Sequence, residues 1–400
     1  MTALDPTCHP RWARTVAELE PRPATAGGRA AISFAYGLPD PALFPTEALN
    51  AATGIVLREH SDRALQYGAG QGLPQLINVL VERLNRAEGL AIRPDECMIT
   101  AGAGQAIAVV GRALLDPGDT VLVETPAWPG GINAFRRCGA RLVPVPVDAE
   151  GLDTDALAQT LETLAAAGTQ PKLLYTVPNF QNPTGVTTTL ARRQALLDLA
   201  RRYDFVILED DAYRDLAFEG PLPPSLFALD TDGRVLRTGT YSKILAAGLR
   251  LGWLLGPRDV LPRLIALKDD GGTSPFTSYL AATYSRAGEL DPHIARLVAS
   301  YRRKRDVMLA ALTRYFPKSV TWTVPAGGFF VWVTLPPGTD AADLLRAARE
   351  EGVDFLPGRS CFPDPQAGTS HLRLAFSLPT PDQIEEGIKR LGNVLAAALG

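Results

Sequence analysis

The run CMITAGAGQAIAVVGRALLDPGDTVLVE, residues 97–124, contains a complete strand–helix–strand pattern. A β-rich run at 97–100 precedes an amphipathic segment at 105–115, and a second β-rich run follows at 120–124. The alternation continues with helical segments at 130–139 and 189–203 and β-rich runs at 172–177 and 205–209. Such alternation is typical of right-handed βαβ units. We predict an α/β fold with a mainly parallel, seven-stranded-type sheet sandwiched by helices.

Beyond residue 256 the pattern changes. It predicts one long helix at roughly 277–316, a strand in GGFFVWVTL (327–335), and a second strand in LRLAFS (372–377). Further helices are expected near 340–351 and from about 382. This mixture indicates a smaller α+β domain. We expect an N-terminal arm at 1–45 that joins the small domain, a large domain at 46–290, and a small domain at 291–400.

The composition argues against several partner classes. The 400-residue chain is 46% hydrophobic and carries 40 basic and 43 acidic residues, so its net charge of −3 gives no pull toward nucleic acid or anionic membranes. The four cysteines form no CxxC and the four histidines no HExxH, so neither disulfides nor a metal site are expected. We predict a cytoplasmic protein, without signal peptide or membrane span, that acts on a small molecule.

The segment GTYSKILAAGLRLGW (239–253) places a lysine in an apolar run. Partial burial would lower the pKa of Lys243 and make its amine a nucleophile toward carbonyls, able to hold an aldehyde cofactor as a Schiff base. Thr240, Ser242 and Arg250 would supply hydroxyls and a guanidinium for a phosphate group. Taken alone, the segment also fits an ordinary lysine at the end of a strand.

A second candidate phosphate site lies in ITAGAGQAIAVV (99–110). Gly102, Ala103 and Gly104 follow a predicted strand and open a helix, where free backbone N–H groups favour an anion. The dinucleotide motif GxGxxG fails, because Ile107 stands where its third glycine would be. A plain helix start is the alternative.

Polar residues follow two more predicted strands. PNFQNPTG (178–185) places Asn179 and Asn182 at the carboxyl end of a strand, where parallel sheets bind ligands. LEDDAY (208–213) places Asp210 and Tyr213 at another strand end, and a carboxylate there could hold the proton of a pyridinium ring. Each group alone fits a cap or turn, but their coincidence at successive strand ends favours a cofactor site.

Together the motifs resemble a known family. QYGAGQG with Tyr67, ETPAWPGG with Trp128, PNFQNPTG, EDDAY, GTYSKILAAGLRLGW, GGFFVWV and LRLAFS occur in the order found in fold-type I pyridoxal 5′-phosphate (PLP) enzymes of the class I/II aminotransferase family. The resemblance covers roughly residues 35–398 and is greatest to the branch with α-aminoadipate and kynurenine aminotransferases. It implies transfer of an amino group between an α-amino acid and a 2-oxo acid, in a homodimer with shared active sites.

The resemblance also implies roles for single residues. Lys243 would bind PLP as a Schiff base, Asp210 would pair with the pyridine nitrogen, and Tyr213 would complete the catalytic set. Asn182 and Tyr213 would hold the ring hydroxyl, and Trp128 would stack on the ring.

The remaining roles concern the phosphate and the substrate. The phosphate would be bound by Thr240, Ser242, Arg250, the N–H groups of Ala103 and Gly104, and Tyr67 of a second subunit. Arg373 would clamp the substrate carboxylate, with Gly37 and Asn182 also near the substrate.

The sequence departs from the family pattern at three positions. Relatives usually carry a hydroxyl and an amide side chain where Ala103 and Gly104 stand, so phosphate binding here leans more on backbone groups and Arg250. Trp128 replaces a more usual tyrosine, which keeps the stacking face, changes the pocket size and removes a phenol.

Some candidates and functions stay open. Thr273 and Ser274, in DDGGTSPF (269–276), are candidates for contact with a neighbouring subunit's cofactor site, since relatives make that contact here. The arm arginines fit either ligands for a distal substrate carboxylate or a solvated surface: Arg11, Arg14, Arg22 and Arg29. Besides transamination, the same residues would suit cyclisation, elimination or oxidation of an amino acid on PLP. A PLP sensor is a third class, disfavoured because residues 1–35 are too few for a DNA-binding module.

Overall fold

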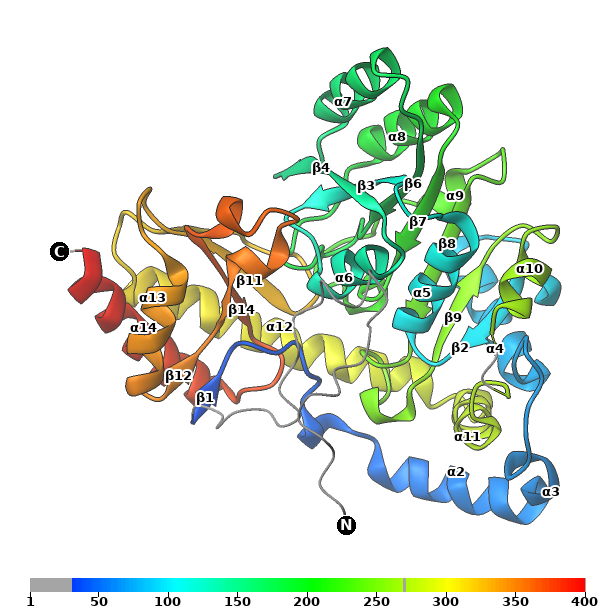
Figure 1. Ribbon diagram of the computed structural model, residues 1–400. Coiled ribbons are helices and arrows are strands. Elements are labelled where there is room, and N and C mark those ends of the chain that lie inside the picture. The colour runs from blue at the N-terminus through cyan, green and yellow to red at the C-terminus, as the bar shows by residue number, and fades with distance from the viewer. Residues whose placement is uncertain (1–30, 269–270, 400) are drawn as a thin grey trace, which may run out of the picture.

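Two β-sheets organise the computed structural model, which describes residues 31–268 and 271–399 (Figure 1). The larger sheet has the strand order β2-β9-β8-β7-β6-β3-β4-β5. Only β9 and the two-residue β5 run antiparallel to their neighbours in the described part of this sheet. The predicted α/β fold class is confirmed, and β5 brings the count to eight strands. The strands are β2 (Cys97–Thr100), β3 (Thr120–Thr125), β4 (Arg141–Asp148), β5 (Gly151–Leu152), β6 (Pro171–Thr176), β7 (Val206–Asp210), β8 (Val235–Thr240) and β9 (Gly252–Leu255).

Both faces of this sheet are covered, because alternate residues of its strands point to opposite sides. In β3, Val121 and Val123 join one apolar cluster with α5 (Ala103–Leu114) and α6 (Pro129–Arg137). Leu122 joins another cluster with α7 (Thr154–Ala166) and α8 (Leu190–Tyr203). The carboxyl ends of the parallel strands therefore open between two helical layers.

The smaller sheet is antiparallel and has the order β10-β11-β14-β13. Its strands are β10 (Thr321–Trp322), β11 (Phe330–Thr334), β13 (Leu356–Pro357) and β14 (His371–Ala375), with α13 (Ala341–Glu350) and α14 (Pro381–Leu399) nearby. A separate pair joins β1 (Ile32–Ser33) to β12 (Val353–Asp354) in parallel. The chain from β1 onward thus starts beside the C-terminal third (Figure 1).

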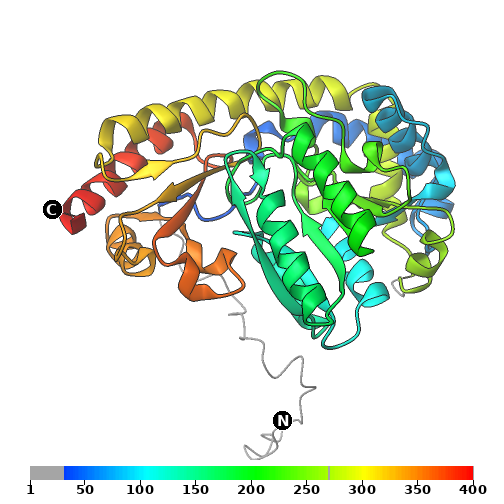
Figure 2. The same cartoon turned by 90° about the horizontal axis from the view of Figure 1, so that it is seen from above.

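The prediction of one continuous helix at 277–316 is wrong, because the structure has two helices there. The structure has α11 (Pro275–Arg286) and α12 (Leu290–Tyr315), separated at Gly288, whose φ of 77° ends α11 in the left-handed region that glycine favours. α12 packs against α14 and also reaches residues 214–216 after β7. Figure 2 shows it running along one side of the molecule past both sheets.

The remaining helices lie mainly at the β2 end of the larger sheet and beyond it (Figure 1). They are α2 (Thr46–Glu59), α3 (Ser61–Ala64), α4 (Pro74–Glu88), α9 (Leu226–Leu229) and α10 (Leu261–Ala266). Within the described ranges, no helix combines the length and apolarity needed to cross a membrane.

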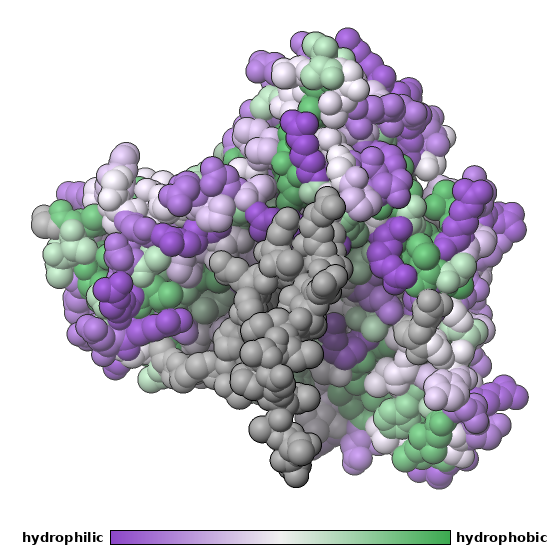
Figure 3. All heavy atoms as spheres, in the orientation of Figure 1, coloured by the Kyte–Doolittle hydropathy of each residue, from purple (hydrophilic) through white to green (hydrophobic). Residues whose placement is uncertain are grey.

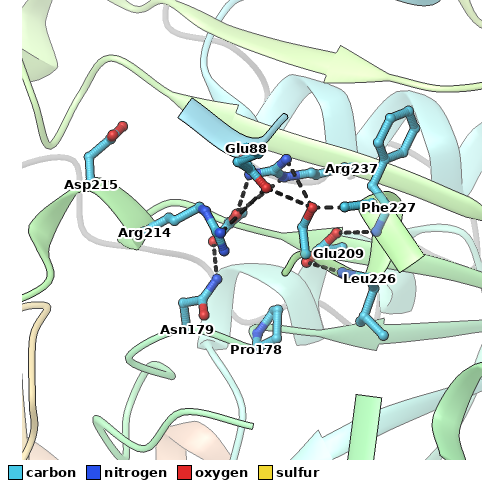
Figure 4. A network of polar contacts seen from close by, with 12 residues as sticks. Glu88, Pro178, Asn179, Glu209, Arg214, Asp215, Leu226, Phe227 and Arg237 are labelled. Carbon is cyan, nitrogen blue, oxygen red and sulfur yellow. Dashed lines mark hydrogen bonds and ion pairs between the residues drawn. The ribbon is translucent and has the colours of Figure 1, made fainter. Parts of the chain in front are cut away.

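A buried polar network ties α4 to the ends of β7 and β8 (Figure 4). The Arg237 guanidinium donates to Asp211 Oδ2 at 2.7 Å and to Glu88 Oε1 at 2.6 Å. Asn179 Nδ2 donates to Asp211 Oδ1 at 2.7 Å. The side chains of Arg237, Asp211 and Glu88 are at most 5% exposed. Each charge is paired, which offsets the free-energy penalty of its burial.

We predict that Arg237→Ala destabilises the protein by about 3–5 kcal/mol, because it removes the cation that two buried carboxylates share and leaves Arg214, at 3.4 Å, as the remaining cation of Glu88 among the described residues. Urea unfolding of the two proteins measures the difference. Arg234→Ala is the control: Arg234 pairs with Asp204, whose side chain is 72% exposed, so its loss should change the free energy of unfolding far less. Equal losses in both variants would contradict the importance of the buried network.

Candidate functional site

A cavity of about 300 Å³ opens at the carboxyl ends of the parallel strands. The structure brings ten of the predicted site residues to its walls: Ala103, Gly104, Trp128, Asn182, Asp210, Tyr213, Thr240, Ser242, Lys243 and Arg250. They lie at the last residue of, or in the segment after, five different strands, β2, β3, β6, β7 and β8. The sheet order therefore gathers side chains that lie up to 147 positions apart in the sequence (103 to 250).

Lys243 lies three residues after the end of β8, and its side chain points into apolar and aromatic surroundings. Its Nζ donates to the carbonyl oxygen of Gly37 at 2.9 Å and lies 5.5 Å from the ring centre of Phe329. Burial lowers the pKa of Lys243 to about 8, and the nearby charges of Arg373 and Arg250 act in the same direction. A larger fraction of this amine than of an ordinary lysine is therefore uncharged near neutral pH.

Asp210 is the member of the acidic run EDD that lines the cavity. Its Oδ2 accepts a hydrogen bond from the Tyr175 hydroxyl at 2.8 Å, whereas its buried Oδ1 has no partner among the described residues. Burial raises the pKa of Asp210 to about 7. A buried carboxylate oxygen without a donor is unfavourable unless a ligand supplies one.

The two neighbouring acids have partners elsewhere (Figure 4). Asp211 belongs to the Arg237 network, and Glu209 accepts the backbone N–H groups of Leu226 and Phe227, each at 3.0 Å. Asn179, a candidate from its position at a strand end, likewise bonds Asp211 and Arg193. These three residues hold the strand ends in place, and they do not line the cavity.

The opposite part of the cavity suits an anion. Ala103 and Gly104 begin α5, so their N–H groups have no acceptor within the helix, and no atom lies within 4 Å of the place where a Gly104 Cβ would be. The Thr240 and Ser242 hydroxyl oxygens lie 2.9 Å apart, and the Thr240 hydroxyl donates to the Leu251 carbonyl oxygen at 3.0 Å. Arg250 holds a left-handed backbone conformation (φ 54°), and its Nη2 lies 3.3 Å from the Ala101 carbonyl oxygen. Together they form a cradle of N–H, hydroxyl and guanidinium groups.

Arg373 comes from β14 of the smaller sheet and is 6% exposed. Its Nη1 donates to Asn182 Oδ1 and its Nη2 to the Ala35 carbonyl oxygen, both at 2.7 Å, while the guanidinium lies over the Phe330 ring. Its buried Nε has no partner among the described residues. The residue does not line the 300 Å³ cavity itself, but it touches the wall at Asn182.

The segment around Gly37 closes the cavity beside Lys243. Ser377 donates to the Leu38 carbonyl oxygen at 2.7 Å, and the Lys304 ammonium pairs with Asp40 at 2.6 Å, so the segment is fixed to the C-terminal part of the chain. A Cβ at Gly37 would lie 2.4 Å from the tip of the Phe330 ring. Glycine is therefore needed for this close approach.

Tyr67 is not brought to the cavity. It is 86% exposed and lies at a separate hollow of about 280 Å³ that Thr273 also lines. The Thr273 hydroxyl lies 3.3 Å from the Ile99 carbonyl oxygen, and Ser274 caps α11 by accepting the Thr277 N–H. The candidate arginines of the arm, Arg11, Arg14, Arg22 and Arg29, lie outside the described residues.

Several residues at the site were missed by the sequence analysis. Leu38, Val177, Ala212 and Ala247 also line the cavity, beside Gly102, which was already expected at the phosphate site. These residues are next to motif residues in the sequence, so they could have been predicted from the motifs. Tyr175 could have been predicted less easily. It is a tyrosine in the largely apolar strand KLLYTV, and only the contact of its hydroxyl with Asp210 distinguishes it from an ordinary core residue.

We predict that the Lys243 amine reacts at lower pH than an ordinary lysine, because the uncharged form is the nucleophile. In cofactor-free protein, reductive methylation with formaldehyde should reach half its maximal rate at Lys243 near pH 8, measured by peptide mass spectrometry. Lys172 is the internal control, since its hydrogen bond with Asp119 raises its pKa and should delay its labelling. If both lysines were labelled in parallel, the inferred environment of Lys243 would be wrong.

Comparisons with known proteins agree with this geometry. A family model for aminotransferase class I and II matches residues 39–391. The chain is 39% identical to aromatic-amino-acid aminotransferase 1 of Thermococcus litoralis, over 91% of this chain and 88% of the relative. It is 39% identical to the 2-aminoadipate transaminase of Thermus thermophilus, over 92% and 91%.

A similar solved structure is that of Pyrococcus horikoshii kynurenine aminotransferase, a complex that contains PMP, kynurenine and kynurenic acid. The two structures superpose with a TM-score of 0.92 at 36% identity, over 98% of each chain. The chain therefore belongs to the class I and II aminotransferases, near the aminoadipate and kynurenine branch, and is a PLP-dependent transaminase that transfers an amino group between amino and oxo acids.

Proposed function

We propose that Lys243 and Asp210 are the residues through which this chain carries out transamination. The observation that carries the proposal is that both residues line the same cavity. Lys243 has an amine of lowered pKa, and Asp210 has a buried carboxylate oxygen without a partner among the described residues. PLP fits these walls. Asp210 Oδ1 matches a protonated ring nitrogen, and the cradle at α5 and Arg250 matches a phosphate.

In this assignment each residue has a defined task. PLP, when bound, supplies an electron sink for the electrons left at the substrate Cα. Lys243 would hold the cofactor through Nζ, and its amine, once freed, would move the Cα proton as general base and acid. Asp210 would hold the ring nitrogen's proton. Asn182 and Tyr213 would bind the ring hydroxyl, and Trp128 would stack on the ring.

We assign the substrate α-carboxylate to Arg373. Its fork is held in place by Asn182, the Ala35 carbonyl group and the Phe330 ring, and a rigid guanidinium suits bidentate binding of a carboxylate. Gly37 adjoins this space and leaves room for the substrate backbone. The relatives named for aromatic amino acids and for 2-aminoadipate support α-amino acids as the substrate class.

We predict that the holoenzyme, mixed with single amino acids and no acceptor, converts its cofactor to the aminated form and releases the matching 2-oxo acid. Absorbance follows the cofactor and mass spectrometry the product. Arg373→Ala should lower the apparent affinity for all α-amino acids by about 10- to 100-fold, the scale of a lost charged pair, and leave simple amines little changed. Arg359→Ala, a half-exposed arginine paired with Asp340, is the control. Equal losses for amines and amino acids would move the clamp elsewhere.

We further propose a homodimer with shared sites. Leu57, Leu65 and Tyr67 are 44%, 69% and 86% exposed on the α2–α3 side, where Figure 3 shows hydrophobic residues at the lower right. Exposed apolar groups of this kind favour a protein interface. In the proposed dimer, Tyr67 reaches the phosphate in the other subunit, and the hollow with Thr273 faces that site.

We predict complementation between two inactive variants. In a 1:1 mixture of Lys243→Ala and Tyr67→Ala proteins, half the dimers are hybrid and each has one native site, so activity should reach about a quarter of wild type. Lys243→Ala mixed with Arg250→Ala is the control, because Lys243 and Arg250 act in the same subunit and no native site forms. Proven subunit exchange without recovery in the first mixture would exclude a shared site.

The division into an arm at 1–45, a large domain at 46–290 and a small domain at 291–400 stays a proposal, as does a cytoplasmic location. The pairing of β1 with β12 supports the association of the arm's end with the small domain.

A further inference from the structure

We infer that Tyr175 is a positioning residue for Asp210: its hydroxyl holds one carboxylate oxygen so that the other faces the ring nitrogen of the cofactor. The inference rests on the proposed role of Asp210 and adds a residue that takes no part in the roles given above. Tyr175 itself does not line the cavity, so it acts through Asp210.

The strand register places the two side chains on one face of the sheet. β6 pairs with β7 in parallel, with Tyr175 opposite Leu208. Residues two apart in a strand point to the same side, so Asp210 lies on the face of Leu208 and Tyr175, one step closer to the strand end. The Tyr175 hydroxyl reaches Asp210 Oδ2 at 2.8 Å along this face.

The Tyr175 ring is held so that its hydroxyl has one direction. The residue is fully buried, and Phe135 of α6 packs on its ring with centroids 5.5 Å apart. A Cβ at Gly131 would lie 2.5 Å from Tyr175 Cε1 and 3.1 Å from its hydroxyl. Gly131, three residues after Trp128, thus leaves the space that the Tyr175 ring occupies. This close packing explains why the second glycine of ETPAWPGG is a glycine.

The hydrogen bond has an electrostatic consequence. It favours the charged form of Asp210, against burial and against nearby negative charges that favour the neutral acid. The titratable or charged groups near Asp210 are Tyr175 of β6, Glu124 of β3, Asp211 and Tyr213 just after β7, and Lys243 after β8. Without the tyrosine hydroxyl, the pKa of Asp210 should rise further above its ordinary range. A neutral Asp210 would then hold the ring nitrogen's proton less firmly.

The test compares two ligands of the cofactor-free protein: PLP and its 1-deaza analogue, in which carbon replaces the ring nitrogen. Both ligands share the aldehyde and phosphate contacts. The affinity for PLP divided by the affinity for the analogue therefore reports the contact between Asp210 and the ring nitrogen, and this quotient is the ratio used below. In Tyr175→Phe we expect this ratio to fall about tenfold, the scale of a hydrogen bond to a charged group, with the analogue's own affinity unchanged.

The pH dependence supplies a readout that a merely structural role would not move. In the wild type the ratio should fall as the pH drops through the pKa of Asp210, near 7. In Tyr175→Phe the midpoint should lie at higher pH, because the carboxylate has lost a donor. Tyr284→Phe is the matched control: Tyr284 is 1% exposed in α11, and its hydroxyl contacts only the Glu289 carbonyl group in the described structure, so neither quantity should change.

Two further variants separate the possible failures. Gly131→Ala should lower the ratio as Tyr175→Phe does, because the added methyl group displaces the ring. Asp210→Asn should lower the ratio and cancel the effect of Tyr175→Phe. An unchanged ratio in Asp210→Asn would overturn the proposed role of Asp210. A lowered ratio in Asp210→Asn with a normal ratio and midpoint in Tyr175→Phe would overturn only the role of Tyr175.

Discussion

The charge of a buried carboxylate at the end of β7 is the constraint on which the arrangement of this site depends. A carboxylate away from water is unfavourable unless donors or cations reach it. Asp210 receives one hydrogen bond, from Tyr175, and keeps its other oxygen without a donor among the described residues. In the role proposed for Asp210, a protonated pyridine ring would satisfy that deficit.

The two neighbouring acidic residues, in contrast, have hydrogen-bond partners for their buried carboxylates. Asp211 is fully paired by Arg237 and Asn179, and Glu209 by two backbone N–H groups at the start of α9. These contacts fix the strand end against α4 and α9 and leave Asp210 as the carboxylate on the cavity wall. Three acidic residues in succession therefore divide into two that hold the backbone in place and one that is available for chemistry.

Lys243 lies in the same low-dielectric surroundings, but burial lowers the pKa of its amine, whereas it raises the pKa of the Asp210 carboxyl group. Burial and the positive charges of Arg373 and Arg250 favour its neutral amine, which is the form that attacks a carbonyl group. Arg373 thus affects the site in two ways. Its guanidinium touches Asn182 from the smaller sheet, and its charge helps lower the pKa of the lysine. Arg373 is therefore one of the residues that couple the two sheets at the site, beside the contact of Tyr213 with Phe330 of β11.

The sequence by itself was sufficient for the fold class and for most of the cavity wall. Alternating periodicity in residues 97–209 requires a parallel sheet, and parallel strands present their carboxyl ends at one edge. The motif order then led to the family, and with it to Lys243, Asp210 and Arg250. α11 and α12 were merged because the apolar periodicity continues across the break, although Gly288 followed by Pro292 is a local helix-end signal.

Only the tertiary structure showed which residue supports Asp210 and which partners its two acidic neighbours take. Tyr175 and Asp210 are 35 positions apart and meet because β6 and β7 are neighbours in register. Arg373 and Asn182 are 191 positions apart and meet because the smaller sheet lies against the strand ends. Such contacts depend on strand order and side-chain direction in three dimensions, whereas composition and periodicity depend only on residues close together in the chain.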